Sequence, residues 1–331
     1  MILTSCTGRS IVKPLPKPLP TPLMTKLVLI SRDYDMSALA PVIVAAAPEL
    51  QVHSFGAPNT GDAQVAVCWN PPAGALRSLP ELRLVHAIAA GVDNILCDPQ
   101  LPAVPICRVV DPYQARAMSE FVMWGALHFH RQFDQVLANQ RAGLWQVPAQ
   151  KLASDCTIGV MGLGEIGARV AADLLHAGFT VKGWARSDRT LPGIQSFSSR
   201  DALPAFLSGV DILVCLLPLT SETRGLLNAD LLRQLNPGAK LIHVGRGEHL
   251  VMDALLAALS NGHMDGAIVD VFPNEPLSPD DPLWRHPKLI VTPHMAAIAS
   301  LETIGSQIAE NVRRLMRGEP LNNQVDVGQR Q

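Results

Sequence analysis

The chain of 331 residues has few aromatic residues, little net charge and no long apolar run, and these absences exclude several classes of protein. Lysine and arginine number 27 and aspartate and glutamate 29, so the formal net charge is −2. Without a basic stripe, nucleic acid is not expected as a partner. No apolar run reaches about 18 residues, so no membrane span is expected. The apolar stretch of a signal peptide is also missing, and a cytoplasmic location is therefore expected.

Cysteine is sparse as well, and its six copies are scattered along the chain. No Cys-x-x-Cys pair and no Cys/His spacing typical of zinc occurs, so neither a disulfide framework nor a metal site is expected. Four histidines of the C-terminal half also lack the His-Glu-x-x-His pattern. They are His243, His249, His263 and His286.

Proline is concentrated at the start of the chain, in residues 13–23 (KPLPKPLPTPL). Proline at this density excludes both helix and sheet. Met24 then begins a run that suits a first strand. Residues 1–24 are therefore expected to be either a disordered tail or upstream sequence read from an early start codon.

Beyond this segment, strand-length apolar runs alternate with helical patterns, which is typical of parallel α/β structure. The length favours two domains. Strands are expected at 27–31, 65–69, 84–89 and 106–109 in the first domain, and at 157–161, 180–185, 211–217, 239–244, 267–272 and 289–292 in the second. Helices are expected at 37–47, 115–142, 165–177, 200–208, 228–235, 252–260 and 301–317. The second set predicts a doubly wound, Rossmann-type sheet.

A glycine fingerprint follows the strand expected at 157–161 and precedes a helical pattern. In that context the first glycine permits a tight turn, the second lets a pyrophosphate approach the backbone, and the third lets helix and strand pack closely. The helix N-terminus then offers free N–H groups to phosphate. The residues expected to bind the dinucleotide here are Gly162, Leu163, Gly164, Glu165, Ile166 and Gly167.

Three residues of the C-terminal half are the candidate catalytic residues. Arg246 ends an apolar run, Glu275 lies in a Pro- and Asn-containing loop, and His294 ends another apolar run. Imidazole can supply a proton near neutral pH, and a carboxylate nearby favours its protonated form. A guanidinium can hold a substrate carboxylate and polarise the adjacent carbonyl. Together with a dinucleotide, these groups indicate hydride transfer to a 2-oxo acid.

These segments resemble the D-2-hydroxyacid dehydrogenase family over about residues 26–320, and within it most closely reductases of glyoxylate and hydroxypyruvate. Further matching stretches are 67–72, 90–96, 183–187 and 281–287. The resemblance implies two Rossmann-like domains with doubly wound parallel sheets and an active-site cleft between them. It implies a discontinuous substrate domain, 25–112 with 293–331, and a cofactor domain, 113–292. It also implies that Arg246 binds substrate and that Glu275 partners the general acid His294.

The resemblance further indicates the cofactor. Ala185 stands where NAD-specific members have the ribose-binding acid, and Arg186 and Ser187 suit a 2′-phosphate. NADP(H) is therefore expected to be preferred, with NAD(H) possible. The alternative is that Arg186 is a solvated loop residue and that Asp188 binds ribose. Other expected cofactor contacts are Leu217 and Pro218 over the nucleotide, the Val244 carbonyl near the ring and Asp270 at the carboxamide.

The same resemblance assigns the substrate pocket and the partners. The turn Ala90–Gly91–Val92 is expected to present N–H groups to the substrate carboxylate, and Trp69 to form a pocket wall. Simple core packing is the alternative for Trp69. Trp145 is expected to reach into the pocket of a second subunit, which implies a homodimer. Two other functions stay open: a dehydrogenase of a bulkier 2-hydroxy acid or of phosphoglycerate, and a non-enzymatic, NAD(P)-sensing corepressor-like protein.

Overall fold

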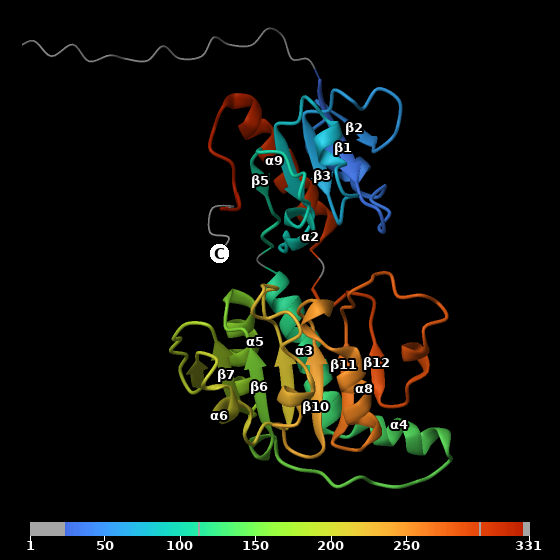
Figure 1. The fold of residues 1–331 in the computed structure, drawn as a ribbon, viewed down its shortest axis with the longest axis vertical. Coiled ribbons are helices and arrows are strands. Elements are labelled where there is room, and N and C mark those ends of the chain that lie inside the picture. The colour runs from blue at the N-terminus through green and yellow to red at the C-terminus, as the bar shows by residue number, and fades with distance from the viewer. Residues whose placement is uncertain (1–23, 112, 298, 327–331) are drawn as a thin grey trace, which may run out of the picture.

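The computed structural model describes residues 24–111, 113–297 and 299–326. The segment 1–23 lies outside these described residues, so its expected disorder stays a prediction. The chain forms two lobes stacked end to end, each built around its own sheet (Figure 1). The α/β class with parallel sheets, predicted from the sequence, is confirmed.

The smaller lobe contains a five-stranded parallel sheet with the order β2-β1-β3-β4-β5. Its strands are β1 (Thr25–Ile30), β2 (Leu50–Ser54), β3 (Val65–Cys68), β4 (Leu84–Ala87) and β5 (Ile106–Cys107). Its helices are α1 (Leu39–Ala46), α2 (Asp93–Leu96) and the C-terminal α9 (Leu301–Arg317). Central strands β3 and β4 are buried throughout, as strands covered on both faces must be.

The larger lobe contains a seven-stranded parallel sheet with the order β12-β11-β10-β9-β6-β7-β8. Its strands are β6 (Thr157–Met161), β7 (Thr180–Ala185), β8 (Gln195–Ser198), β9 (Ile212–Cys215), β10 (Ala239–His243), β11 (Met264–Val269) and β12 (Leu289–Val291). Its helices are α3 (Gln114–His130), α4 (Phe133–Arg141), α5 (Glu165–His176), α6 (Leu203–Leu207), α7 (Ala229–Leu232) and α8 (Met252–Ser260). The order reverses between β6 and β9, which is where such sheets bind ligands.

Helix α9 returns the chain to the smaller lobe and packs on α1 and β4. Gly305 makes the close crossing possible, because a Cβ there would lie 2.8 Å from Val42 Cγ1. Asn311 is fully buried; its amide nitrogen donates to His86 Nε2 (3.1 Å) and to the Asn322 carbonyl (3.0 Å). The smaller lobe is thus built from both ends of the chain. The exact domain boundaries stay predictions.

The single helix expected at 115–142 is wrong, because the structure has two helices there. Gln132 adopts a left-handed conformation (φ 56°), which ends α3 and redirects α4. The preceding helix α3 packs closely on the sheet, since a Cβ at Gly125 would lie 2.9 Å from the Cδ1 atoms of Ile242 and Ile268. Among the described residues, no helix combines the length and the apolarity that crossing a membrane would require.

Two strands were not expected from the sequence, β2 and β8, and one was misplaced. Both β2 and β8 are edge strands with polar, partly exposed residues, so they lack a strong apolar run. The strand expected at 267–272 begins earlier, at Met264, and ends at Val269. The residues after Val269 form the loop that carries Glu275.

Candidate active site

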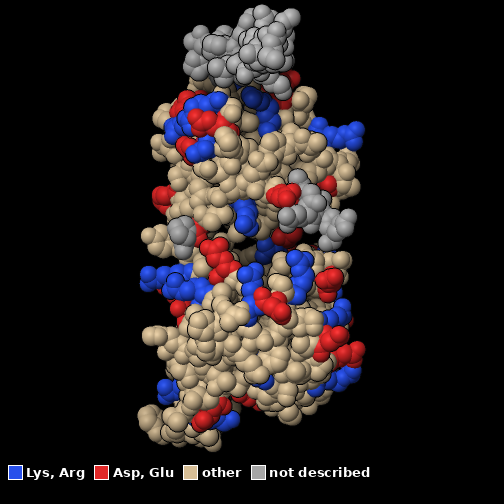
Figure 2. Space-filling view, turned by 90° about the vertical axis from the view of Figure 1, so that its left-hand side faces the viewer, with Lys and Arg blue, Asp and Glu red and all other residues tan. Residues whose placement is uncertain are grey.

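Three candidate residues follow three neighbouring strands of the larger sheet. Arg246 follows β10, Asp270 follows β11 and His294 follows β12. Since the carboxyl ends of parallel strands meet at one edge of a sheet, these residues share that edge. A cavity of about 880 Å³ is lined there by Arg246, Glu275 and His294, and by residues of the smaller lobe, including Trp69 and Asp93. Figure 2 shows acidic and basic side chains gathered around the hollowed waist between the lobes.

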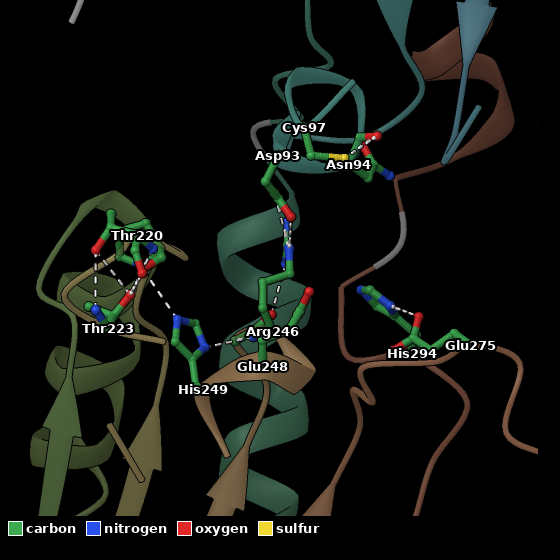
Figure 3. A network of polar contacts seen from close by, with 12 residues as sticks. Asp93, Asn94, Cys97, Thr220, Thr223, Arg246, Glu248, His249, Glu275 and His294 are labelled. Atoms are coloured by element: carbon green, nitrogen blue, oxygen red, sulfur yellow. Dashed lines mark hydrogen bonds and ion pairs between the residues drawn. The ribbon is translucent and has the colours of Figure 1, made fainter. Parts of the chain in front are cut away.

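Glu275 and His294 form a hydrogen-bonded pair (Figure 3). The distance from His294 Nδ1 to Glu275 Oε2 is 2.7 Å, and both side chains are partly exposed. Glu275 Oε1 accepts from the Phe272 backbone N–H at 2.8 Å, which fixes the carboxylate within its own loop. With Nδ1 donating to the carboxylate, His294 Nε2 makes no other hydrogen bond within the described chain. This nitrogen is therefore available for proton transfer.

Asp270 holds the loop that carries His294. Its buried carboxylate accepts hydrogen bonds from Thr292 Oγ1 (2.6 Å) and from the N–H groups of Met295 (2.9 Å) and Ala296 (3.0 Å). Its backbone carbonyl accepts from the His294 N–H at 2.9 Å. His294 itself has a positive φ of 52°, a conformation that a bulky residue adopts only when its surroundings enforce it. The expected contact of Asp270 with the cofactor stays a prediction.

Arg246 joins the two lobes by an ion pair with Asp93, the first residue of α2 (Figure 3). Arg246 Nε lies 3.1–3.2 Å from both Asp93 carboxylate oxygens. Arg246 Nη1 donates to the carbonyl of the preceding residue, Gly245, at 2.8 Å. The side chains are 26% and 36% exposed, so the pair contributes only about 0–1 kcal/mol to stability. Its importance lies in orientation, because it leaves Nη2 without a hydrogen bond among the described residues.

The free Nη2 of Arg246 lies beside the turn expected to bind the substrate carboxylate. A Cβ at Gly91 would lie 1.8 Å from Nη2, so a side chain at this position would displace the guanidinium. Ala90 and Val92 flank this point and are partly exposed. Trp69 packs edge-on against the His294 ring at 5.7 Å between centroids and lines the cavity. The structure therefore brings these expected substrate residues together.

Trp145 is the exception among the expected substrate residues. Its side chain is fully exposed (101%), and it does not line the cavity of its own chain. It belongs to the segment that follows α4, and this segment runs along the end of the larger lobe that is remote from the smaller lobe (Figure 1). Any contact of Trp145 with a substrate must therefore involve another subunit.

The glycine fingerprint forms the turn between β6 and the N-terminus of α5. Gly162 has a positive φ of 102°, and a Cβ on Gly167 would lie 1.7 Å from the Gly162 carbonyl oxygen. Gly164 has open space where its Cβ would stand. Leu163 is buried, whereas Glu165 and Ile166 open helix α5. These features fit a dinucleotide, whose phosphate would approach the open side of Gly164.

The residues expected at the far end of the nucleotide are exposed at the end of β7. Arg186 and Ser187 follow Ala185 directly and are both exposed. Asp188, the alternative ribose ligand, is instead hydrogen-bonded by the Ser198 hydroxyl. This arrangement favours Arg186 and Ser187 as the ligands of a 2′ substituent.

The remaining expected cofactor contacts lie at the ends of β9 and β10. Leu217 is buried, and the Pro218 carbonyl accepts from Thr223 Oγ1 at 2.8 Å. Val244 donates its N–H to the Cys215 carbonyl at 3.2 Å. Their roles toward the cofactor stay predictions.

Sequence reasoning missed Asp93, His243 and His249 as residues of this site. Asp93 had a detectable signal, since it is a charged residue directly after the turn that is expected to bind the substrate carboxylate. The two histidines stand near Arg246 in the sequence, but only the folded backbone shows that their rings bond to it.

Comparisons with known proteins agree with this geometry. The family model of the D-isomer specific 2-hydroxyacid dehydrogenase NAD-binding domain matches residues 123–296. Glyoxylate/hydroxypyruvate reductase A of Escherichia fergusonii is 38% identical over 287 residues, covering 85% of this chain and 92% of that relative. A D-isomer specific 2-hydroxyacid dehydrogenase from Xanthobacter autotrophicus Py2, solved with NADPH and MES, is 40% identical with a TM-score of 0.81, covering 92% and 98%. An NADPH-dependent glyoxylate/hydroxypyruvate reductase from Sinorhizobium meliloti, solved with NADP and sulfate, is 33% identical with a TM-score of 0.83, covering 91% and 98%.

Two glycine substitutions should separate folding from dinucleotide binding. Gly167→Ala places a Cβ against a backbone oxygen, so it should destabilise the fold by about 1–3 kcal/mol and lower the melting temperature. Gly164→Ala meets no protein atom, so it should leave the melting temperature unchanged while weakening NADPH binding about tenfold. Thermal unfolding and fluorescence titration with NADPH measure both effects. Wild-type affinity in Gly164→Ala would contradict the placement of the pyrophosphate.

Proposed function

Because the chain belongs to the D-isomer specific 2-hydroxyacid dehydrogenase family, we propose that it is an NADPH-dependent reductase of small 2-oxo acids. The proposed reactions are glyoxylate to glycolate and hydroxypyruvate to D-glycerate. The observation that carries the proposal is the interlobe cavity that Arg246 shares with the hydrogen-bonded Glu275–His294 pair. The names of the Escherichia and Sinorhizobium relatives support this choice of substrate.

His294 is the proposed general acid. NADPH, when bound at the glycine turn, supplies the hydride that reduces the carbonyl carbon. His294 Nε2 then donates a proton to the oxygen of the former carbonyl, while Nδ1–H stays bonded to Glu275. The carboxylate of Glu275 holds the ring through Nδ1–H and so fixes the orientation of Nε2.

Arg246 is proposed to bind the substrate carboxylate through its free Nη2 edge, together with N–H groups of the turn at Gly91. Asp93 holds Nε and so restricts the guanidinium to one orientation. Trp69 closes the pocket beside His294 and limits the size of the substrate.

Initial rates test this function directly. The purified full chain is assayed with glyoxylate, hydroxypyruvate, pyruvate and phenylpyruvate, each with NADPH and with NADH. The proposal expects the highest kcat/KM for glyoxylate or hydroxypyruvate with NADPH. A preference for phenylpyruvate would favour the bulkier-substrate reading. NADPH binding without turnover of any 2-oxo acid would favour the corepressor-like reading.

Glu275→Gln should reduce kcat by at least about 100-fold. The carboxylate accepts from two donors, the Phe272 N–H and His294 Nδ1. An amide has only one oxygen, so its NH₂ group turns toward one of the donors and disturbs the tautomer or the orientation of His294. Steady-state kinetics measure the loss, with NADPH affinity as the control. A kcat of the variant within threefold of the wild-type value would contradict a role of Glu275 in proton transfer.

The preference for NADPH rests on Arg186 and Ser187 at the end of β7, and relatives solved with NADP or NADPH support it. We expect kcat/KM with NADPH to exceed that with NADH by at least about tenfold, or about 1.4 kcal/mol. Ala185→Asp combined with Arg186→Ala should reverse this preference, because the new carboxylate accepts the ribose 2′-OH and repels a 2′-phosphate. Arg186→Ala alone, the control, should lower only the NADPH rate. Equal use of both cofactors by the wild type would contradict the 2′-phosphate site.

The exposed apolar face of α3 and α4 supports a homodimer as the proposed assembly. Trp124, Leu127, Phe133 and Leu137 are each at least 40% exposed and line a cavity of about 770 Å³. Monomeric proteins rarely expose a contiguous apolar patch of this kind. A second copy that covers this face could also receive the exposed Trp145 in its pocket. The cytoplasmic location stays a prediction from the sequence.

Leu137→Glu should convert the dimer to a monomer, because a charge at the centre of an apolar interface must be desolvated. Val44→Glu on α1 is the matched control, since Val44 is also a helical residue with 40% exposure but lies in the smaller lobe. Light scattering at micromolar concentration should give a dimeric mass for the wild type and for Val44→Glu. A monomeric wild type would refute the dimer.

A further inference from the structure

Two fully buried histidines contact the backbone of Arg246, and the mechanism above does not use them. His243 ends β10, and His249 lies in the 3₁₀ turn Gly247–His249 that follows Arg246. Their rings meet edge-on, with 5.8 Å between centroids. Cys215 is the third member of the group, and the potential ligand atoms of all three residues lie within 4.8 Å of one another.

The hydrogen bonds of these rings are incompatible with a structural zinc site. His249 Nδ1 accepts from the Arg246 N–H at 3.0 Å, and its Nε2 donates to the Pro218 carbonyl at 3.2 Å. His243 Nε2 donates to the Arg246 carbonyl at 2.9 Å. Only His243 Nδ1 and the Cys215 thiol are left for a metal, whereas such a site needs four ligands.

We propose that His243 and His249 are positioning residues that clamp the main chain of Arg246 for binding the substrate carboxylate. His249 accepts from the N–H of Arg246 (Figure 3), and His243 donates to its carbonyl, so both polar backbone groups of this residue are bonded to imidazole. The inference rests on the proposed function, because it needs Arg246 to be the carboxylate ligand. It identifies residues that act on that ligand without touching the substrate.

The glycines on both sides of Arg246 are explained by close contacts, that of Gly245 with the clamp and that of Gly247 with the Phe272 backbone. A Cβ on Gly245 would lie 2.9 Å from His249 Nδ1, so a side chain there would push the ring away from the Arg246 N–H. A Cβ on Gly247 would lie 2.0 Å from the Phe272 carbonyl carbon. The backbone at Arg246 is therefore held between an imidazole and the loop that carries Glu275, and small shifts in it would move the guanidinium.

Both imidazoles must be neutral for this pattern, and burial favours that state. Burial, with a smaller contribution from the neighbouring His249, lowers the pKa of His243 to about 3. Burial also lowers the pKa of His249, and the positive charge of Arg246 lowers it as well. A second proton on His249 would occupy Nδ1, the atom that accepts from Arg246. The neutral tautomers are thus fixed by the two hydrogen bonds of His249 and the one of His243.

The two positions use opposite ring nitrogens, which allows a crossed test with the same two amides. Asparagine places its amide near the position of Nδ1, and glutamine places its amide near Nε2. At position 249 the clamp needs Nδ1, so His249→Asn should bind substrate more tightly than His249→Gln. At position 243 the clamp needs Nε2, so His243→Gln should bind substrate more tightly than His243→Asn. We expect about a tenfold difference within each pair, or about 1.4 kcal/mol.

Two readouts are measured on the full chain: KM for glyoxylate with NADPH, and the Kd of oxalate, a two-carbon dicarboxylate that cannot be reduced, for the NADPH-loaded protein. Melting temperatures are recorded for all four variants. The clamp predicts that the ranking of asparagine and glutamine reverses between the two positions in oxalate Kd. An identical ranking at both positions, or affinities that merely follow the melting temperatures, would overturn it and leave the histidines a structural role.

The oxalate measurement separates this inference from the proposed function. If the wild type reduces no 2-oxo acid but binds oxalate, the proposed function fails while the crossed ranking still decides the clamp. Arg246→Leu must weaken oxalate binding if Arg246 is the carboxylate ligand. Unchanged oxalate affinity in Arg246→Leu, or no oxalate binding by the wild type, would overturn the clamp as well.

Discussion

The parallel order of β10, β11 and β12 is the constraint on which the site depends. Three neighbouring strands that run the same way bring Arg246, Asp270 and His294 to a single edge, although the first and the last lie 48 positions apart in the sequence. An antiparallel neighbour would have placed one of them at the opposite edge. The buried carboxylate of Asp270, at the end of β11, then bonds to the loop that follows β12. These bonds join the ends of the two strands into one rigid unit.

The histidines of this protein differ in how far their rings are exposed to solvent, and their properties differ accordingly. His86 and His243 are fully buried, and burial lowers the pKa of each, to about 4 and about 3. Both are neutral hydrogen-bonding groups; His86 accepts from Asn311 and His243 donates to the Arg246 carbonyl. His294 instead lies in an open cavity with a carboxylate on one nitrogen. The same side chain thus serves as a neutral hydrogen-bonding group in two places and is the proposed proton donor in a third.

Much of this arrangement could be predicted from the sequence, because its signals are local. The strand, glycine turn and helix around Gly164 follow one another within about twenty residues, and the apolar runs before Arg246 and His294 are continuous. The edge strands β2 and β8 were missed because their stability comes from pairing with a neighbour and not from apolar composition. The break at Gln132 was missed because a left-handed glutamine has no composition signal.

Contacts between distant segments were the harder part. The Asp93–Arg246 pair joins residues 153 positions apart, and no sequence pattern in either segment predicts this pairing. The clamp of His243 and His249 is close in sequence, yet it depends on a 3₁₀ turn that folds the chain back on itself. A resemblance to a family supplies the roles of the principal residues. It does not supply the hydrogen bonds that orient them.

The return crossing between the lobes has a consequence for recombining this protein with its relatives. A chimaera that exchanges the smaller lobe needs two junctions, one before α3 and one after β12. The second junction falls beside His294, and the N–H groups of Met295 and Ala296 belong to the larger lobe by their bonds to Asp270. A junction directly after β12 would place His294 in a loop from the other protein. A junction beyond Ala296 keeps His294 together with the N–H groups that bond to Asp270. The second junction of such a chimaera is therefore better placed beyond Ala296 than at the end of the last strand.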